Sequence, residues 1–93
     1  SKTMTNTTRP TTFGLCDRSE KHLFCVQPNI PIEHALEHAS YVLGTARVLA
    51  LAAQDLCTEH QSYLNWASLQ LAETGLALVE ASIEGLQADS SAR

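Results

Sequence analysis

The sequence predicts a mainly α-helical fold: an antiparallel hairpin of two helices preceded by an extended arm or small β-ribbon. Apolar residues recur at spacings of three and four over residues 32–57, and again over residues 69–86. Such spacings place apolar side chains along one face of a helix. The polar residues 58–62 lie between the two runs. A connection this short joins helices that pack side by side and antiparallel.

The segment before the first helix resembles β-structure. Two short runs around Phe13 and Phe24 are rich in Thr, Val and aromatic side chains, and six polar residues separate them. If Phe13 faces Val26 and Leu15 faces Phe24, the four apolar side chains share one face of an antiparallel ribbon. An irregular extended arm is the alternative. The Thr-rich residues 1–10 are expected to be disordered.

The first helix is expected over residues 31–57. Pro31 suits the first helical turn, where its missing N–H costs nothing, and Glu33 complements the positive end of the helix dipole. Gly44 in mid-helix costs about 1 kcal/mol relative to Ala, so a close contact is expected there. A turn at residues 58–62 leads into the second helix. The expected divisions are a disordered tail at 1–10, an arm or ribbon at 11–30, a helical hairpin at 31–87 and a frayed tail at 88–93.

Small residues at heptad spacing predict a close contact between the two helices. The first helix offers Ala39, Ala46 and Ala53, and the second offers Ser68, Gly75 and Ser82. The second helix also carries apolar side chains that one neighbouring helix cannot cover. The economical solution is a homodimer that forms a four-helix bundle. The side chains assigned to this second interface are Leu64, Leu71, Leu78 and Trp66.

The distribution of charge is uneven. No Lys or Arg lies between Arg47 and Arg93, whereas six acidic residues do. Binding to nucleic acid needs a basic surface, so no nucleic-acid partner is expected. The acidic helix face indicates solubility, or a docking surface for a basic partner. The apolar stretch at residues 48–53 is far shorter than the roughly 20 residues of a membrane span. No membrane partner and no signal peptide are expected, and the cytoplasm is the expected compartment.

The sharpest chemical motif is His34-Ala-Leu-Glu37-His38, which matches the H-x-x-E-H pattern of inverted zinc proteases. Both imidazoles project from one side of a helix, where two of them suit one metal ion. A catalytic zinc also needs a third protein ligand and a cleft, and a chain of 93 residues offers little room for either. We therefore expect His34 and His38 to be solvent-exposed and to bind metal only weakly.

The three cysteines form no C-x-x-C pair, so zinc-ribbon and redox motifs are absent. Free thiols are expected, with a Cys16–Cys25 disulfide as the alternative, and Cys57 is expected to be a small core residue. No Gly-rich phosphate loop or nucleophile elbow is present either. No catalytic, cofactor-binding or functional metal-binding residue is assigned, and the protein is expected not to be an enzyme.

Several motifs occur together in the order of a known family. They are Thr-Thr-Phe-Gly-Leu-Cys at 11–16, Leu-Phe-Cys-Val at 23–26, Ala-Leu-Glu-His-Ala-Ser at 35–40, Trp-Ala-Ser at 66–68 and Ala-Leu-Val-Glu at 77–80. The chain resembles, over residues 11–82, a family of short pseudomonad proteins classed as a domain of unknown function. Cys25 departs from the small polar residue expected at that position. The resemblance implies a small cytoplasmic bacterial protein with an accessory or regulatory role, and it brings no cofactor or catalytic residue.

The functional prediction is a small non-enzymatic homodimer that acts through protein–protein contacts. Its expected partners are a second copy of itself and a further, unidentified protein. Two alternatives remain from the sequence alone. One is a bundle that binds a small molecule or a metal, and the other is a DNA-linked regulator such as an antitoxin.

Overall fold

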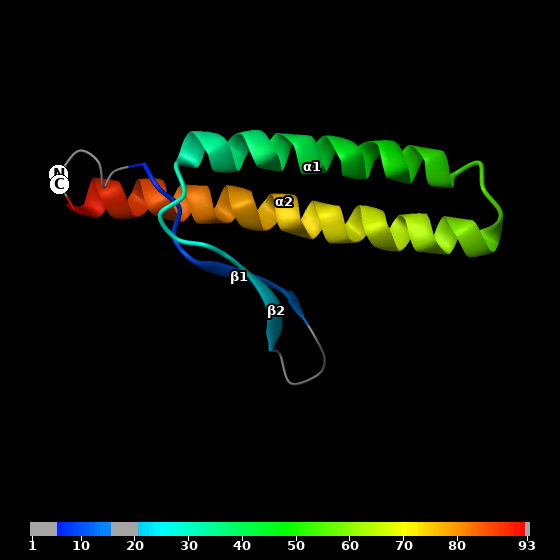
Figure 1. Cartoon of the computed structure of the whole chain (residues 1–93), viewed down its shortest axis with the longest axis horizontal. Helices are drawn as coiled ribbons and strands as arrows, with labels where there is room; N and C mark the ends of the chain where they lie inside the picture. Colours follow the sequence, from blue (N-terminus) through cyan, green and yellow to red (C-terminus); the bar gives the residue numbers. More distant parts are fainter. Residues whose placement is uncertain (1–5, 16–20, 93) are drawn as a thin grey trace.

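The computed structural model describes residues 6–15 and 21–92. Its elements are β1 (Thr11–Leu15), β2 (His22–Val26), α1 (Ile32–Ala53) and α2 (Thr58–Ala92). The two helices lie side by side and antiparallel, and the ribbon of β1 and β2 projects from α2 on the side away from α1 (Figure 1). The predicted helical hairpin with a small N-terminal β-ribbon is therefore confirmed. No helix in the described ranges is long and apolar enough to cross a membrane.

Both helix boundaries at the hairpin turn differ from the prediction. α1 ends at Ala53 and α2 begins at Thr58, so the turn is formed by residues 54–57. The amides of Gln54, Asp55 and Leu56 each donate to the carbonyl three residues earlier, which tightens the last turn of α1. The side chain of Gln61 donates to the Ala53 carbonyl at 2.9 Å. Gln61 thus caps the end of α1 from the next helix, and this contact fixes the shorter turn.

The other end of α2 also differs. The helix continues to Ala92, beyond the expected end near Gln87. α1 begins only at Ile32, whose Cδ1 atom would lie 3.3 Å from a Cβ added to Gly85. Gly85 is therefore level with the start of α1, and the last turns of α2 extend past it. The frayed tail predicted for residues 88–93 is helical over residues 88–92.

The contact between the helices uses the small residues that the sequence singles out. Ser68 Oγ donates to the Ala46 carbonyl at 2.8 Å, so the two backbones are close at that level. Gly75 has no room for a Cβ because the Leu43 side chain fills that space. Ser82 is fully buried, and its hydroxyl donates to the Leu78 carbonyl of its own helix. Small side chains thus allow the close approach that the heptad spacing predicts.

The ribbon forms with a register different from the expected one. Phe13 pairs with Phe24 and Thr11 pairs with Val26, a shift of two residues from the Phe13–Val26 pairing. A shift of two keeps the same side chains on the same face. The observed register places two aromatic rings opposite each other, with centroids 5.4 Å apart, which favours this pairing. Gly14, at φ +73°, lies under the Phe24 ring, where no Cβ would fit.

Residues 6–10 belong to the packed structure, so the disorder predicted for residues 1–10 does not apply to them. Thr8 is 1% exposed. Its amide donates to the Ile30 carbonyl at 2.8 Å, and its hydroxyl donates to the Gln27 carbonyl at 2.7 Å and accepts from the Ile30 amide. Its own carbonyl accepts from the Asn29 amide. The hydrogen bonds of Thr8 therefore hold the arm against the turn that precedes α1. Residues 1–5 lie outside the described residues.

The arm crosses α2 where that helix carries small side chains. The Arg9 amide donates to the Ala81 carbonyl at 3.1 Å, and the Thr7 carbonyl occupies the space that a Cβ of Gly85 would need. Val26 from β2 is buried between Ala77 and Ala81, with Phe13 and Leu78 packed alongside. This contact holds the ribbon on the side of α2 that faces away from α1 (Figure 1).

Candidate interaction surface

The hairpin is a single layer of helices. Its principal extents are 54 × 31 × 15 Å, so over most of its length it is one helix thick. Among the described residues, the buried hydrophobic side chains are those of Ala, Val and Ile. Domains usually bury their large apolar side chains between two packed layers. Here the large leucines of both helices remain accessible on one broad side of the layer.

We define the open apolar face as the set of large aliphatic side chains that lie on this side. Leu69 and Leu76 are 57% and 56% exposed, and the others are more than one-third exposed. Residues seven apart along a helix stay on the same side of it, which aligns Leu36 with Leu43 and Leu69 with Leu76 and Ile83. The members are Leu36, Leu43, Leu69, Leu76, Ile83 and Leu86.

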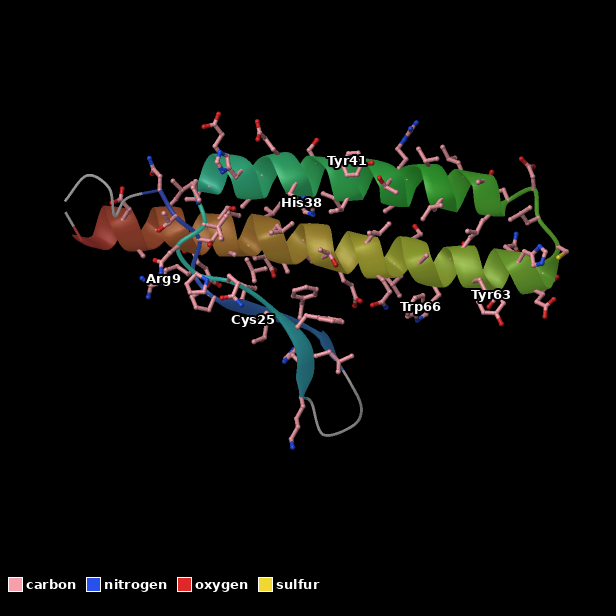
Figure 2. All side chains as sticks on the ribbon, viewed as in Figure 1. Arg9, Cys25, His38, Tyr41, Tyr63 and Trp66 are labelled. Atoms are coloured by element: carbon pink, nitrogen blue, oxygen red, sulfur yellow. The ribbon has the colours of Figure 1, made fainter. Side chains whose placement is uncertain are left out.

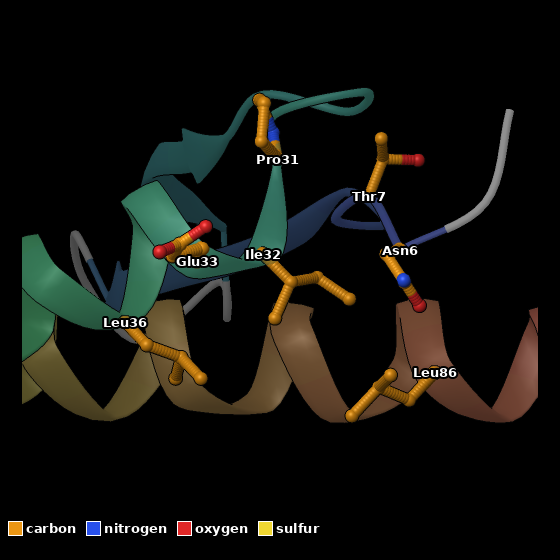
Figure 3. A pocket seen from close by; sticks show the side chains of 7 residues that line it. All are labelled: Asn6, Thr7, Pro31, Ile32, Glu33, Leu36 and Leu86. Atoms are coloured by element: carbon orange, nitrogen blue, oxygen red, sulfur yellow. The ribbon is translucent and has the colours of Figure 1, made fainter. Parts of the chain in front are cut away.

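Contacts between the helices show that the rows from α1 and α2 share one face. Leu43 reaches across to Gly75, the residue just before Leu76. At the other end, Leu36 and Leu86 line the same open hollow of about 610 Å³, together with Ile32 (Figure 3). The ribbon does not cover this face, because it packs on Ala77 and Ala81, and Asn6 and Thr7 of the arm border the face only at the hollow beside Leu86. Ala77 follows Leu76 directly and therefore lies about 100° around the helix.

The exposed area of the chain is large for its mass. A folded monomer of 10.1 kDa is expected to expose about 5,300 Å². The chain exposes 6789 Å². The excess of about 1,500 Å² belongs to the whole elongated chain, and the open apolar face is one part of it. Six large aliphatic side chains gathered on one side of the hairpin make this face the candidate interaction surface.

The side chains that the sequence assigned to the second interface lie elsewhere. Leu64, Leu71 and Leu78 are half-buried within the chain, and Leu78 packs against the arm. Trp66 is 65% exposed and points away from α1 (Figure 2). The exposed row of large aliphatic side chains on α2 also has a signal in the sequence. Leu69, Leu76 and Ile83 each follow one of the small contact residues Ser68, Gly75 and Ser82, so they lie about 100° from the helix contact.

Charged side chains flank the open apolar face in an unequal way. Arg47 follows Leu43 by four residues and precedes Ala50 by three, so it lies beside the α1 row of the face. It is exposed, on the edge of that row away from α2. It is the one Lys or Arg in the sequence of the two helices. Glu73 and Glu80 occupy the corresponding edge of the α2 row, beside Leu76. The α1 edge of the face thus carries both Arg47 and Glu33, which lines the hollow beside Leu36, and the α2 edge carries two negative charges.

Aromatic side chains mark the outer side of α2. Tyr63 is 70% exposed and, with Ser62 and Trp66, lines a shallow hollow of about 400 Å³ (Figure 2). On the outer side of α1, Gly44 is exposed, and nothing lies within 4 Å of the position of an added Cβ. The close contact expected at Gly44 is therefore not made within the chain. The contact lies instead at Gly75.

The remaining candidate side chains are exposed and separate from one another. His34 and His38 are exposed on α1, as expected. Over residues 6–15 and 21–92, no three His, Cys, Asp or Glu side chains are grouped closely enough to hold a metal ion. Cys25 and Cys57 are free and exposed. The expectation of a core position for Cys57 is wrong, because α1 ends four residues earlier and leaves Cys57 in the turn. Cys16 lies outside the described residues.

No curated protein matches this chain, and no solved structure matches it either. Residues 7–84 match a family described as "Protein of unknown function (DUF3077)". The match begins in the arm at Thr7 and ends in α2 at residue 84, so it includes the ribbon, α1 and most of α2. The resemblance to an unknown-function family is thereby confirmed, and the chain belongs to the DUF3077 family of proteins of unknown function.

Proposed function

We propose that this protein is a non-enzymatic homodimer that acts through protein–protein contacts, in an accessory or regulatory role. The observation that carries the proposal is the open apolar face. Two such faces packed together form a four-helix bundle with a core of leucine and isoleucine, which one copy of the hairpin lacks. Burying apolar surface contributes about 25 cal/mol per Å², and this gain supports association through the leucines rather than through the polar edges.

Light scattering coupled to size-exclusion chromatography tests the dimer. The wild-type protein is expected to have twice the 10.1 kDa mass of the chain at micromolar concentration. Leu76→Glu places a charge in the middle of the apolar contact, so the variant should run at the mass of one chain. Val48→Glu is the matched control, because Val48 is a similarly exposed aliphatic residue off the open apolar face. A wild-type mass of one chain would refute the proposal.

We assign the docking surface for the second, unidentified protein partner to the outer side of α2. Tyr63 and Trp66 remain accessible there when the open apolar face is covered. Tyr and Trp are enriched among the residues that dominate binding energies, and the nearby Glu59 and Glu73 favour a partner that carries basic side chains.

Affinity capture followed by mass spectrometry tests this surface. A Tyr63→Ala/Trp66→Ala variant is expected to keep the dimer mass and to lose the partner that the wild-type protein retains. Tyr41→Ala on α1 removes an equally exposed aromatic ring and should retain that partner. Retention of the same partner by the double variant would contradict the assignment.

A further inference from the structure

We infer that the hollow beside the start of α1 is a binding site for a small aliphatic amine, a ligand with a primary ammonium group on a straight alkyl chain. The ammonium group pairs with the Glu33 carboxylate, and the alkyl chain lies against the aliphatic side chains of the hollow. This site goes beyond the proposed homodimer, because all of its lining residues belong to one copy of the chain.

The hollow is formed where three segments of the chain meet. The arm contributes Asn6 and Thr7, residues 31–36 contribute most of the remaining lining, and α2 contributes Leu86 (Figure 3). The Ile32 amide donates to the Asn6 carbonyl at 2.8 Å, so a backbone contact holds the arm against the start of α1. The volume of about 610 Å³ lies within the roughly 300–1,000 Å³ that is typical of small-molecule sites.

The floor of the hollow is aliphatic. Ile32 is 7% exposed and lies between Leu36 and Leu86, which are 41% and 46% exposed (Figure 3). Pro31 adds a further apolar ring beside them. These side chains offer only hydrocarbon to a ligand, so a straight alkyl chain covers them without burying a polar group that lacks a partner.

The rim of the hollow is polar and carries a negative charge. Within residues 6–15 and 21–92, no hydrogen bond or ion pair uses the side chains of Asn6, Thr7 or Glu33. Each of them has an oxygen that can accept a hydrogen bond, and the carboxylate only accepts. An ammonium group has three donors and no acceptor, so it matches this set of groups. An anionic head group would instead meet the Glu33 carboxylate with like charge.

The surrounding charges also favour a cation. The amino end of α1 carries about half a positive charge from the helix dipole, and Glu33 places a full negative charge beside it. The Lys and Arg side chains of the described residues lie away from the hollow. Arg47 is fourteen residues further along α1, about 21 Å. Arg9 lies on the side of α2 away from α1 (Figure 2), and Lys21 directly precedes β2 at the far end of the ribbon.

A titration of isotope-labelled protein with straight-chain amines, followed by NMR, tests the site. The amide signals of Ile32, Glu33 and Leu86 should shift, and the affinity should rise about twofold per methylene from butylamine to octylamine. This is half of the roughly fourfold gain expected for full burial, because the hollow is open on one side. Hexanol and hexanoate should bind about fivefold more weakly than hexylamine. Equal affinities for the three ligands would overturn the inference.

Substitutions separate the charge from the aliphatic floor. Glu33→Gln should lower the affinity for hexylamine to that for hexanol and leave hexanol binding unchanged, which shows that the fold is intact. Glu37→Gln, one turn further along α1 and outside the hollow, is the matched control and should change neither affinity. Leu86→Ala should weaken both ligands alike, whereas Leu69→Ala, at a similarly exposed leucine away from the hollow, should not. Unchanged hexylamine binding by Glu33→Gln would contradict the pairing.

A blocked lysine, N-acetyl-lysine methylamide, distinguishes a free amine from a side chain of a partner protein. Its four-carbon stem covers less of the aliphatic floor than an octyl chain does, so it should bind more weakly than octylamine. Tighter binding of the blocked lysine would overturn the assignment to a free amine.

The Leu76→Glu variant tests whether one copy of the chain forms the whole site. It should bind hexylamine as the wild-type protein does, because none of the lining residues is changed. Loss of binding in this variant would overturn a site built within one copy. Failure of the wild-type protein to bind any amine would refute the inference and leave the proposed dimer untouched, and a monomeric wild-type protein that binds hexylamine would do the reverse.

Discussion

Gly44 and Gly85 are both interior helix glycines, and their surroundings are opposite. Gly85 is buried against the Thr7 carbonyl, so the missing side chain lets the arm approach the helix backbone. Gly44 faces open space. Packing within the chain therefore requires glycine at position 85, whereas no contact within the chain requires it at position 44. The sequence alone gives no means of telling them apart, because both occur in an apolar helical pattern.

A matched pair of substitutions separates these two glycines. Gly85→Ala should destabilise the protein by about 1–3 kcal/mol, since a backbone carbonyl cannot move aside for the new Cβ. Gly44→Ala should stabilise it by about 1 kcal/mol through helix propensity alone. Urea denaturation at equal protein concentration measures both. Changes of the same sign would contradict the packing of the arm on α2.

At the scale of the elements, the contact between α1 and α2 depends on small side chains. Ala46 is 6% exposed, and its carbonyl accepts the Ser68 hydroxyl, whereas Ala52 is exposed. Ala46→Leu should therefore cost about 1–3 kcal/mol, because it forces the helices apart. Ala52→Leu should change the free energy of unfolding by less than about 0.5 kcal/mol. Comparing the two thermal melts checks the prediction, and equal effects would mean that the helix contact lies on another face.

How far the sequence predicts each element depends on what fixes it. The two helices and their small-residue contact follow from heptad spacing, which is a local and periodic signal. The turn at residues 54–57 depends on Gln61 reaching back to Ala53, a contact that no spacing rule contains. The register of the ribbon is favoured by the contact between the Phe13 and Phe24 rings. A shift of two residues leaves the same side chains on the apolar face, so the alternation of apolar residues does not select this register.

The two rows of apolar side chains on α2 differ in exposure, and periodicity does not predict this difference. Leu69, Leu76 and Ile83 are exposed, whereas Leu64, Leu71 and Leu78, which the sequence analysis expects at a second interface, are half-buried within the chain. The two rows differ by the rotation of α2 about its axis, and this rotation is fixed by contacts at Ser68 and Gly75 that span the two helices. Periodicity alone does not determine it.

For the whole molecule, the proposed dimer makes stability depend on concentration. Raising the protein concentration tenfold favours the folded dimer by about 1.4 kcal/mol, so the melting temperature should rise by roughly 3–6 °C. Leu76→Glu should abolish this dependence, and Val48→Glu should preserve it. Differential scanning calorimetry over a hundredfold range of concentration measures the effect. A wild-type melting temperature independent of concentration would indicate that the hairpin folds as a single chain.

The bond between Arg9 and Ala81 has a consequence for the order in which the chain is completed. The helical hairpin closes through a four-residue turn, so its contacts are local and form early. The arm joins residues near 9 to residues near 81, and this long-range closure comes late. During synthesis, residues 6–15 leave the ribosome before either helix, yet their binding site on α2 appears only once residue 85 has been added. Throughout elongation the ribbon, with Leu23 and Phe24, is therefore without its docking partner and open to chaperones.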